Sequence, residues 1–119
     1  MKALPLTSAL VAVSALPALA EGTLNIYNFG LYTPPDLIEK FEKTHGIDVT
    51  LTEYDSNETA LAKIEAGGHG FDIIVPSGYV VPIYLEKGLL LKSDPNQMPN
   101  FVNVDPAWVD VSWDPGRSY

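Results

Sequence analysis

Two short segments of the sequence combine aromatic rings with a glycine and a polar group, which suits the binding of a small solute. They read NFGLY at 28–32 and PSGY at 76–79. Ring faces pack on sugars, on ammonium groups and on the methylenes between such groups, and a cation over a ring contributes ~0.5–2 kcal/mol. Singly, each glycine fits a turn better and each ring fits a core better, but their coincidence in both segments makes binding an equal alternative. The predicted patch is lined by Phe29, Tyr32, Ser77 and Tyr79, with Gly30 and Gly78 letting the backbone approach a ligand.

Each segment directly follows a predicted β-strand. Mostly apolar runs at 24–29 and 71–75 predict buried strands, and the alternation of apolar and polar residues at 47–51 predicts a strand with one buried face. Both loops therefore leave the carboxyl end of a strand, which is the edge where open α/β sheets bind ligands.

Helix signals separate the strands. Thr33 is a good N-cap before Pro34, and Gly46 ends that helix as a C′ glycine. Ser56 or Asn57 caps a second, short helix. The predicted helices run from Pro34 to Gly46, from the Ser56 or Asn57 cap to Gly67-Gly68, and over 79–87, with a brief further strand at 89–91.

The order β-α-β-α-β-α predicts an α/β fold with a parallel sheet and right-handed crossovers. Crossovers on opposite faces give the strand order 2-1-3, which makes the first and third strand ends neighbours. The two ring-bearing loops are then expected to converge on one patch. The helix starts that follow these loops would instead favour an anion, so the sequence alone leaves cationic and anionic ligands open.

The first 20 residues predict a secretory signal peptide. Lys2 gives a positive start, an apolar stretch fills most of 3–17, and Ala18-Leu19-Ala20 is a small-residue cleavage pattern, so we expect cleavage after Ala20. The apolar run is too short for a membrane anchor. Residues 21–119 then form the exported chain, and the absence of cysteine excludes a lipid anchor on an N-terminal cysteine. We therefore expect an unanchored protein of a bacterial periplasm, with no direct membrane insertion.

Charge and composition exclude several function classes. The formal net charge is −8, and loss of Lys2 makes it more negative. This balance argues against nucleic acid, which selects for basic patches. His45 and His69 lie without carboxylates at metal-ligand spacing, so no metal site is expected. No catalytic motif, nucleophile elbow or phosphate loop stands out, so we expect neither an enzyme nor a cofactor.

The segment 92–119 differs from the rest of the chain. It carries prolines at 95, 99, 106 and 115, together with Trp108 and Trp113, and little periodic structure. A loop of this length is uncommon inside a compact domain. We expect it to belong to a larger fold of which residues 21–119 are a fragment; a stand-alone domain with an extended tail is the alternative.

Three stretches of the sequence resemble the start of the spermidine/putrescine-binding proteins, the periplasmic solute receptors of polyamine ABC importers. They are LNIYNFGLYTPPDLIEKFEKTHGIDVTLTEYDSNETALAKI from Leu24, FDIIVPSGYVVPIYLEKGLLLK from Phe71 and MPNFVNVDP from Met98. The strings YDSNET at 54–59 and VPSGY at 75–79 are the more specific parts. The resemblance implies a type II periplasmic-binding-protein-like lobe, with 21–119 as the N-terminal part of the first of two lobes.

The same resemblance implies a ligand and a set of contacts. In the family, rings sandwich a polyamine's methylene chain in the cleft between lobes, and carboxylates hold its ammonium groups. The ligand-binding residues that it implies here are Phe29, Gly30, Leu31, Tyr32, Ser77 and Tyr79. The family usually has a tryptophan at Phe29, a polar residue at Gly30 and an acid at Leu31. These departures leave a shorter polyamine, a singly charged amine or an amino-acid-like solute open.

The sequence therefore predicts the solute-binding component of an ABC importer, which binds a polyamine or a related small cationic solute and delivers it to an inner-membrane permease. A receptor of the same fold for a sugar, ferric iron or an anion is the alternative within binding. The alternative of another class is a stand-alone secreted interaction module.

Overall fold

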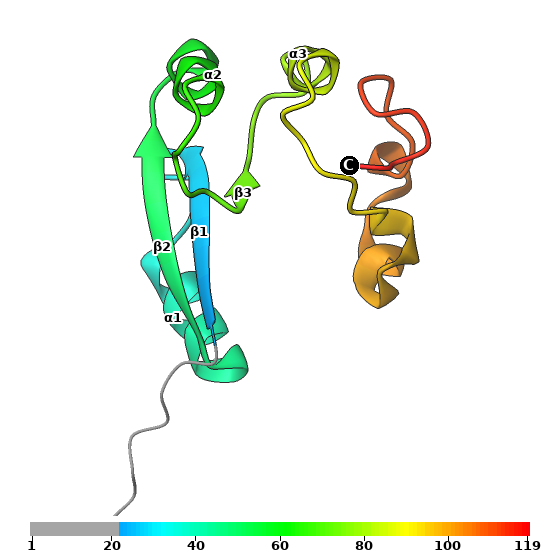
Figure 1. Cartoon of the computed structure of the whole chain (residues 1–119). Coiled ribbons are helices and arrows are strands. Elements are labelled where there is room, and N and C mark those ends of the chain that lie inside the picture. Colours follow the sequence, from blue (N-terminus) through cyan, green and yellow to red (C-terminus); the bar gives the residue numbers. More distant parts are fainter. Residues whose placement is uncertain (1–21) are drawn as a thin grey trace, which may run out of the picture.

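The computed structural model describes residues 22–119. The predicted signal peptide and its cleavage site lie outside the described residues. Strands and helices alternate, as Figure 1 shows. They are β1 (Gly22–Phe29), α1 (Pro35–His45), β2 (Ile47–Tyr54), α2 (Asn57–Glu65), β3 (Ile73–Ile74) and α3 (Val81–Glu86), followed by 3-10 turns at Pro95–Gln97, Pro99–Asn103 and Pro106–Trp108.

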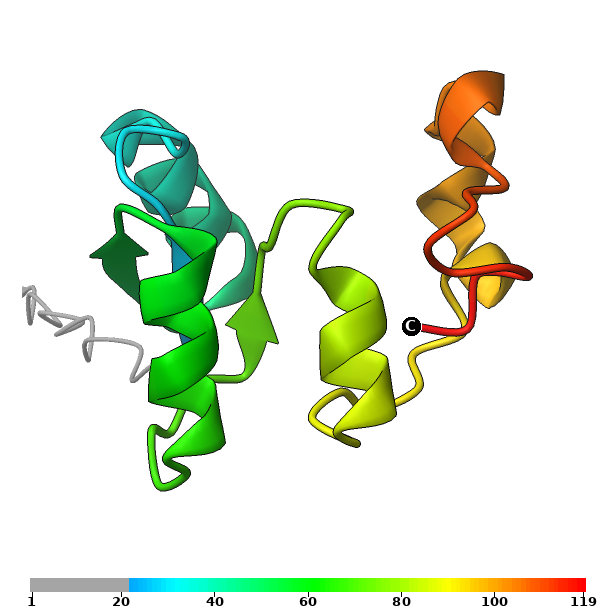
Figure 2. The same cartoon turned by 90° about the horizontal axis from the view of Figure 1, so that it is seen from above.

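The strands form one parallel sheet in the order β2-β1-β3, which confirms the predicted order and the α/β class. β1 pairs with β2 along its whole length, from Gly22 opposite Ile47 to Phe29 opposite Tyr54. Helices α1 and α2 lie on opposite faces of the sheet (Figure 2). Two right-handed crossovers in opposite directions produce this arrangement, and it brings all three carboxyl strand ends to one edge.

Tyrosines form much of the core beneath that edge. Tyr27, Tyr54 and Tyr84 are buried with Ala60, Ile64 and Val80. The Tyr27 ring stacks on Phe71 with centroids 4.3 Å apart and meets Tyr54 edge-on at 4.7 Å. Aromatic pairs in these geometries add to the stability that burial alone gives. A packed cluster of aromatic rings therefore lies beneath the carboxyl ends of the strands.

The start of α1 differs from the expectation from sequence, and its end agrees with it. Pro34, not Thr33, occupies the N-cap of α1, and Pro35 is its first residue. The Thr33 hydroxyl instead accepts a hydrogen bond from the Asn28 amide at 3.0 Å. Gly46 ends the helix at φ 64°, as predicted, because a left-handed C-cap favours glycine.

The later elements are shorter than predicted. β3 contains only Ile73–Ile74 where 71–75 was expected, and α3 covers Val81–Glu86 where 79–87 was expected. Backbone bonds from Asp72 to Asn25 and from Val75 to Tyr27 extend β3 at both ends, but Pro76 has no N–H to continue the ladder. The brief strand predicted at 89–91 does not form.

The segment after α3 lies on the far side of that helix from β1 and β2 (Figures 1 and 2). It contains three 3-10 turns, so the long loop expected there has some local structure. Trp108 remains 60% exposed. Trp113 packs over Gly78, so it does find a partner, and that partner is the strand-end loop itself.

Candidate solute-binding site

An open hollow of about 420 Å³ lies at the carboxyl ends of β1 and β2. It is lined by Tyr27, Gly30, Glu53, Tyr54, Asp55 and Thr59. Gly30 follows β1, and its N–H donates to the Tyr54 carbonyl at 3.0 Å. The loops after β1 and β2 therefore form one continuous rim around the hollow.

The loop after β1 presents two exposed side chains above a half-buried ring. Phe29 packs on Tyr54 with centroids 4.4 Å apart and on Tyr32 at 5.3 Å, so its ring supports the loop from below. Tyr32 is 70% exposed and Leu31 is 97% exposed. Such exposed rings and side chains are what a ligand or a second lobe could cover.

Glu53 fixes this loop. Its Oε1 accepts a hydrogen bond from the Leu31 N–H at 2.9 Å. Leu31 has φ 66°, a left-handed conformation that is uncommon for a residue other than glycine. The bond from Glu53 holds that conformation and places a carboxylate beside the Leu31 backbone.

The loop after β3 is held by Asn57 at the start of α2. The Ser77 N–H donates to Asn57 Oδ1 at 3.1 Å, and Asn57 Nδ2 donates to Ser77 Oγ at 3.0 Å and to the Tyr79 hydroxyl at 2.9 Å. The Tyr79 hydroxyl in turn lies 3.5 Å from Glu58 Oε1. Tyr79 is 68% exposed, so its ring faces solvent while its oxygen is anchored.

Of the six candidate residues, Gly30 alone lines this hollow. The two loops that carry the candidates rest on the end of β2 and on the start of α2. The loop after β1 rests on Glu53, and the loop after β3 rests on Asn57 and Glu58. Glu53 and Glu58 were not predicted from the sequence, and Asn57 was predicted only as a candidate helix cap. The predicted strand order could have indicated them, because the carboxyl end of β2 lies at the same edge of the sheet.

The electrostatics of the rim favour a cation over an anion. Glu53 and Asp55 are exposed and line the hollow, and the exposed Glu58 lies beside the Tyr79 hydroxyl. Of the two helix starts that follow the ring-bearing loops, α1 carries Asp36 in its first turn, whereas α3 carries no acid there. Glu58 lies in the first turn of α2. A carboxylate there satisfies the partial positive charge of the helix end. The exposed acids near the hollow thus suit a positively charged group better than an anion.

Burial raises the pKa of the Tyr54 phenol, beneath the hollow, to about 12, with further contributions from Tyr84, Tyr27 and Tyr32. Its hydroxyl donates to the Val75 carbonyl at 2.5 Å. Tyr54 is therefore neutral at physiological pH, and it ties the end of β2 to the backbone just before the Ser77 loop.

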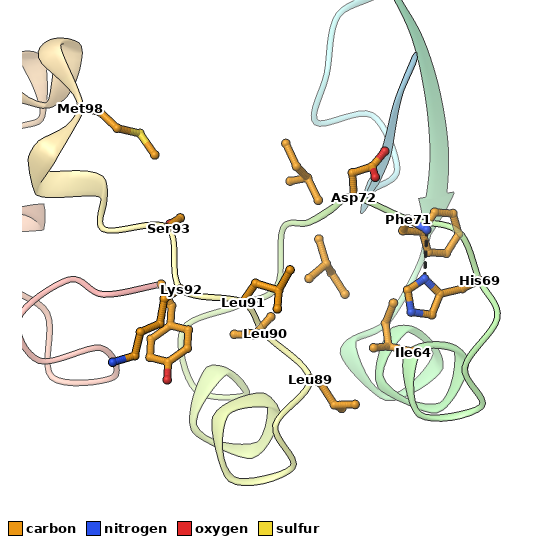
Figure 3. A pocket seen from close by; sticks show the side chains of 13 residues that line it. Ile64, His69, Phe71, Asp72, Leu89, Leu90, Leu91, Lys92, Ser93 and Met98 are labelled. Carbon is orange, nitrogen blue, oxygen red and sulfur yellow. Dashed lines mark hydrogen bonds between the residues drawn. The ribbon is translucent and has the colours of Figure 1, made fainter. Parts of the chain in front are cut away.

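A larger cavity lies away from these loops and is mostly apolar (Figure 3). It has a volume of about 630 Å³, and its walls come from α2, β3, the segment 89–93, Met98 and Tyr119. His69 lies on its wall and accepts the Phe71 N–H at Nδ1, 3.0 Å away. Since its walls are chiefly leucine, isoleucine and phenylalanine, it suits a hydrophobic segment better than a charged solute.

Trp113 supports the Ser77 loop from the other side. A Cβ atom added at Gly78 would lie 2.7 Å from Trp113 Nε1, so the indole ring occupies the space that any side chain would need. Arg117 lies over the same ring at 5.3 Å. The glycine is thus required here by close packing rather than by ligand approach.

Gly78→Ala is accordingly expected to destabilise the fold by ~1–3 kcal/mol, because overpacking forces the ring to shift. Urea unfolding followed by indole fluorescence in a Trp108→Phe background, which leaves Trp113 as the reporter, measures the effect. Gly22→Ala is the matched control, since nothing lies within 4 Å of its added Cβ. Equal stability of Gly78→Ala and Gly22→Ala would contradict the packing of Trp113 on Gly78.

Residues 22–119 contain no group of three or more histidine, cysteine or acidic residues that could hold a metal ion. Within the same range, no helix is long and apolar enough to cross a membrane.

The parallel sheet in the order 2-1-3, with its strand ends opening on an acidic, tyrosine-lined hollow, has the architecture of a solute-receptor lobe. The profile of the family described as bacterial extracellular solute-binding protein matches residues 30–117. The chain belongs to this family.

Individual relatives fall in one branch of it. The spermidine/putrescine-binding periplasmic protein of Salmonella typhimurium is 38% identical over 110 residues, covering 92% of this chain and 32% of the relative. The putrescine-binding periplasmic protein PotF of Escherichia coli is 41% identical over 99 residues, covering 82% and 27%. The spermidine/putrescine ABC transporter substrate-binding protein PotD of Streptococcus pneumoniae superposes with a TM-score of 0.78 at 34% identity, covering 83% and 31%.

These comparisons confirm the resemblance to spermidine/putrescine-binding proteins and the fold that it implied. The matched relatives are solute-binding proteins. The chain spans about a third of the length of the curated relatives it matches.

Proposed function

We propose that the chain forms the N-terminal part, residues 21–119, of the first lobe of a periplasmic receptor for polyamines or a related small cationic solute. The observation that carries this proposal is the gathering of exposed acids and rings at the strand ends: Glu53 and Asp55 line the hollow, Glu53 binds the loop of Tyr32, and Glu58 lies beside the Tyr79 hydroxyl. Carboxylates suit the ammonium groups of a polyamine, and ring faces suit its cationic ends and methylenes. The printed names of the relatives point to the same ligands.

On this proposal, a second lobe closes over the rim, and the loaded receptor delivers its solute to the permease of an inner-membrane ABC importer. The predicted signal peptide, cleaved after Ala20, exports the chain to the periplasm. The relatives support this location, because their names call them periplasmic. The role is binding rather than catalysis, and it uses no cofactor.

Calorimetric titration of the full-length product of the gene tests the function. Putrescine and spermidine should bind, whereas maltose, sulfate and ferric citrate should not, and higher salt should weaken binding because exposed charges are screened. Tyr32→Ala should weaken polyamine binding by roughly threefold to thirtyfold, the equivalent of a lost cation–ring contact. Trp108→Ala removes an exposed ring far from the rim and is the control. Heat with a sugar or an anion, but none with any polyamine, would refute the proposal.

A further inference from the structure

The Asn57 side chain forms hydrogen bonds with a loop that lies 20 to 22 positions further along the chain. Its residue is 6% exposed, and the hydrogen bonds of its amide all go to Ser77 and Tyr79. It is the first residue of α2, one position after the N-cap, where a side chain ordinarily caps the helix. Ser56 performs that capping, since its hydroxyl accepts the Thr59 N–H at 3.2 Å. Asn57 is therefore free for another role.

The orientation of the Asn57 amide follows from one partner. The Ser77 backbone N–H can only donate, so the amide oxygen must face it. The amide nitrogen then faces the two hydroxyl oxygens at 3.0 and 2.9 Å, and has one N–H for each. Backbone and both side chains of the loop are thereby held by a single group.

This arrangement sets what Tyr79 offers to a ligand. One lone pair of its oxygen accepts from Asn57, and its hydrogen faces Glu58 Oε1 at 3.5 Å. The second lone pair remains, and the ring stands exposed beside it. A ring face and an acceptor oxygen held side by side suit an alkylammonium group, which presents methylenes and N–H donors together.

We propose that Asn57 is the positioning residue of the binding rim: it fixes Ser77 and Tyr79 in the arrangement that receives the solute, without touching the solute itself. This inference rests on the proposed function and deepens it. A buried amide that lost its partners would be left unsatisfied, so the loop is held in one place before any ligand arrives. Preorganisation of this kind raises affinity because the loop need not be ordered on binding.

Two variants of Asn57 test the inference in the full-length protein. Asn57→Ala removes every bond to the loop, whereas Asn57→Asp keeps acceptors for the Ser77 N–H and for both hydroxyls. We expect Asn57→Ala to weaken putrescine binding about tenfold, the equivalent of one hydrogen bond to a buried group, and to speed hydrogen exchange at the Ser77 amide. Asn57→Asp should restore slow exchange and bind putrescine at least ten times more tightly than Asn57→Ala.

Ser56→Ala separates positioning from stability. It removes the cap of the same helix, one residue away, without a bond to the Ser77 loop, so it should lower the melting temperature and leave putrescine affinity unchanged. Asn57→Ala with unchanged affinity, or Asn57→Asp that behaves like Asn57→Ala, would overturn the inference. If the unaltered protein binds no polyamine, the proposed function fails first. The exchange of the Ser77 amide then decides on its own whether Asn57 holds the loop.

Discussion

Tyr84→Ala is expected to lower the free energy of unfolding by ~3–5 kcal/mol, as removal of a buried aromatic ring generally does. Tyr84 is fully buried, at 0% exposure, and packs with Tyr27, Tyr54 and Val80 in the core beneath the rim. Small domains are stable by only ~5–15 kcal/mol. This one substitution should therefore remove a large part of the total, which urea unfolding followed by circular dichroism measures.

Tyr84→Phe is expected to raise the free energy of unfolding instead of lowering it. The Tyr84 hydroxyl is buried and has no hydrogen-bond partner among residues 22–119, so its removal should raise stability by ~1 kcal/mol. Tyr54→Phe is the matched control in the same cluster. Its hydroxyl donates to the Val75 carbonyl, so the loss of that bond should lower stability by ~1 kcal/mol. If both variants changed the free energy of unfolding in the same direction, the two hydroxyls would not differ in their hydrogen bonding as described.

Alkaline pH offers a second measurement on the same pair. Burial raises the pKa of Tyr84 and of Tyr54 to about 12 from 10.0. The folded chain therefore holds these protons where the unfolded chain releases them. Stability should be fully present below pH 10, should fall between pH 10 and pH 12, and should level off above that. The Tyr84→Phe and Tyr54→Phe variants should each lose part of this dependence. If stability fell just as steeply between pH 10 and pH 12 in both variants, these two tyrosines would not be the source of the pH dependence.

The sequence was sufficient for the strand order, because alternating strand and helix signals leave few right-handed topologies. Gly46 and Ser56 were also predictable, since each acts through its own backbone or through a residue three positions away. Thr33 was not, because Asn28 competes for its hydroxyl once the chain turns after β1. Capping rules consider only the residues next to the helix start, so they do not predict this hydrogen bond from Asn28.

The edge of the sheet to which the two loops lead was predictable, because topology alone decides it. Strand ends brought the loops of Leu31 and Ser77 to the same edge, as expected. Asn57 and Glu53 were missed because their roles depend on contacts across 20 and 22 positions of sequence, which spacing does not reveal. The fit of Trp113 against Gly78 was hidden for the same reason.

Leu31→Asp is expected to tighten putrescine binding by roughly threefold to tenfold. Leu31 is 97% exposed at the rim, so a carboxylate there can reach a ligand ammonium without disturbing the core. A hydrogen bond to a charged group contributes ~1.5–3 kcal/mol, and exposure to solvent reduces that contribution to ~1 kcal/mol. The gain should shrink as salt rises, because the pair is screened. Calorimetry at two salt concentrations measures both effects.

Leu31→Asn separates charge from backbone strain. Asparagine and aspartate both tolerate a positive φ better than leucine does, and Leu31 lies at φ 66°. Leu31→Asn should therefore raise thermal stability slightly, whereas in Leu31→Asp the repulsion between the new carboxylate and Glu53 offsets that gain. We expect Leu31→Asn to change putrescine affinity by less than about twofold, so that the difference between the two variants isolates the carboxylate.

A substitution at Glu53 provides a further test of the carboxylate added in Leu31→Asp. Its Oε1 already lies 2.9 Å from the Leu31 N–H, so an aspartate at 31 would place a second carboxylate close to it. Without ligand these carboxylates repel each other, and a bound ammonium group relieves the repulsion. Glu53→Gln combined with Leu31→Asp should then keep the added acid but lose part of the gain in affinity. If Leu31→Asp binds putrescine no better than Leu31→Asn at low salt, residue 31 does not face the solute, and the cation site must be sought nearer to Tyr79 and Glu58.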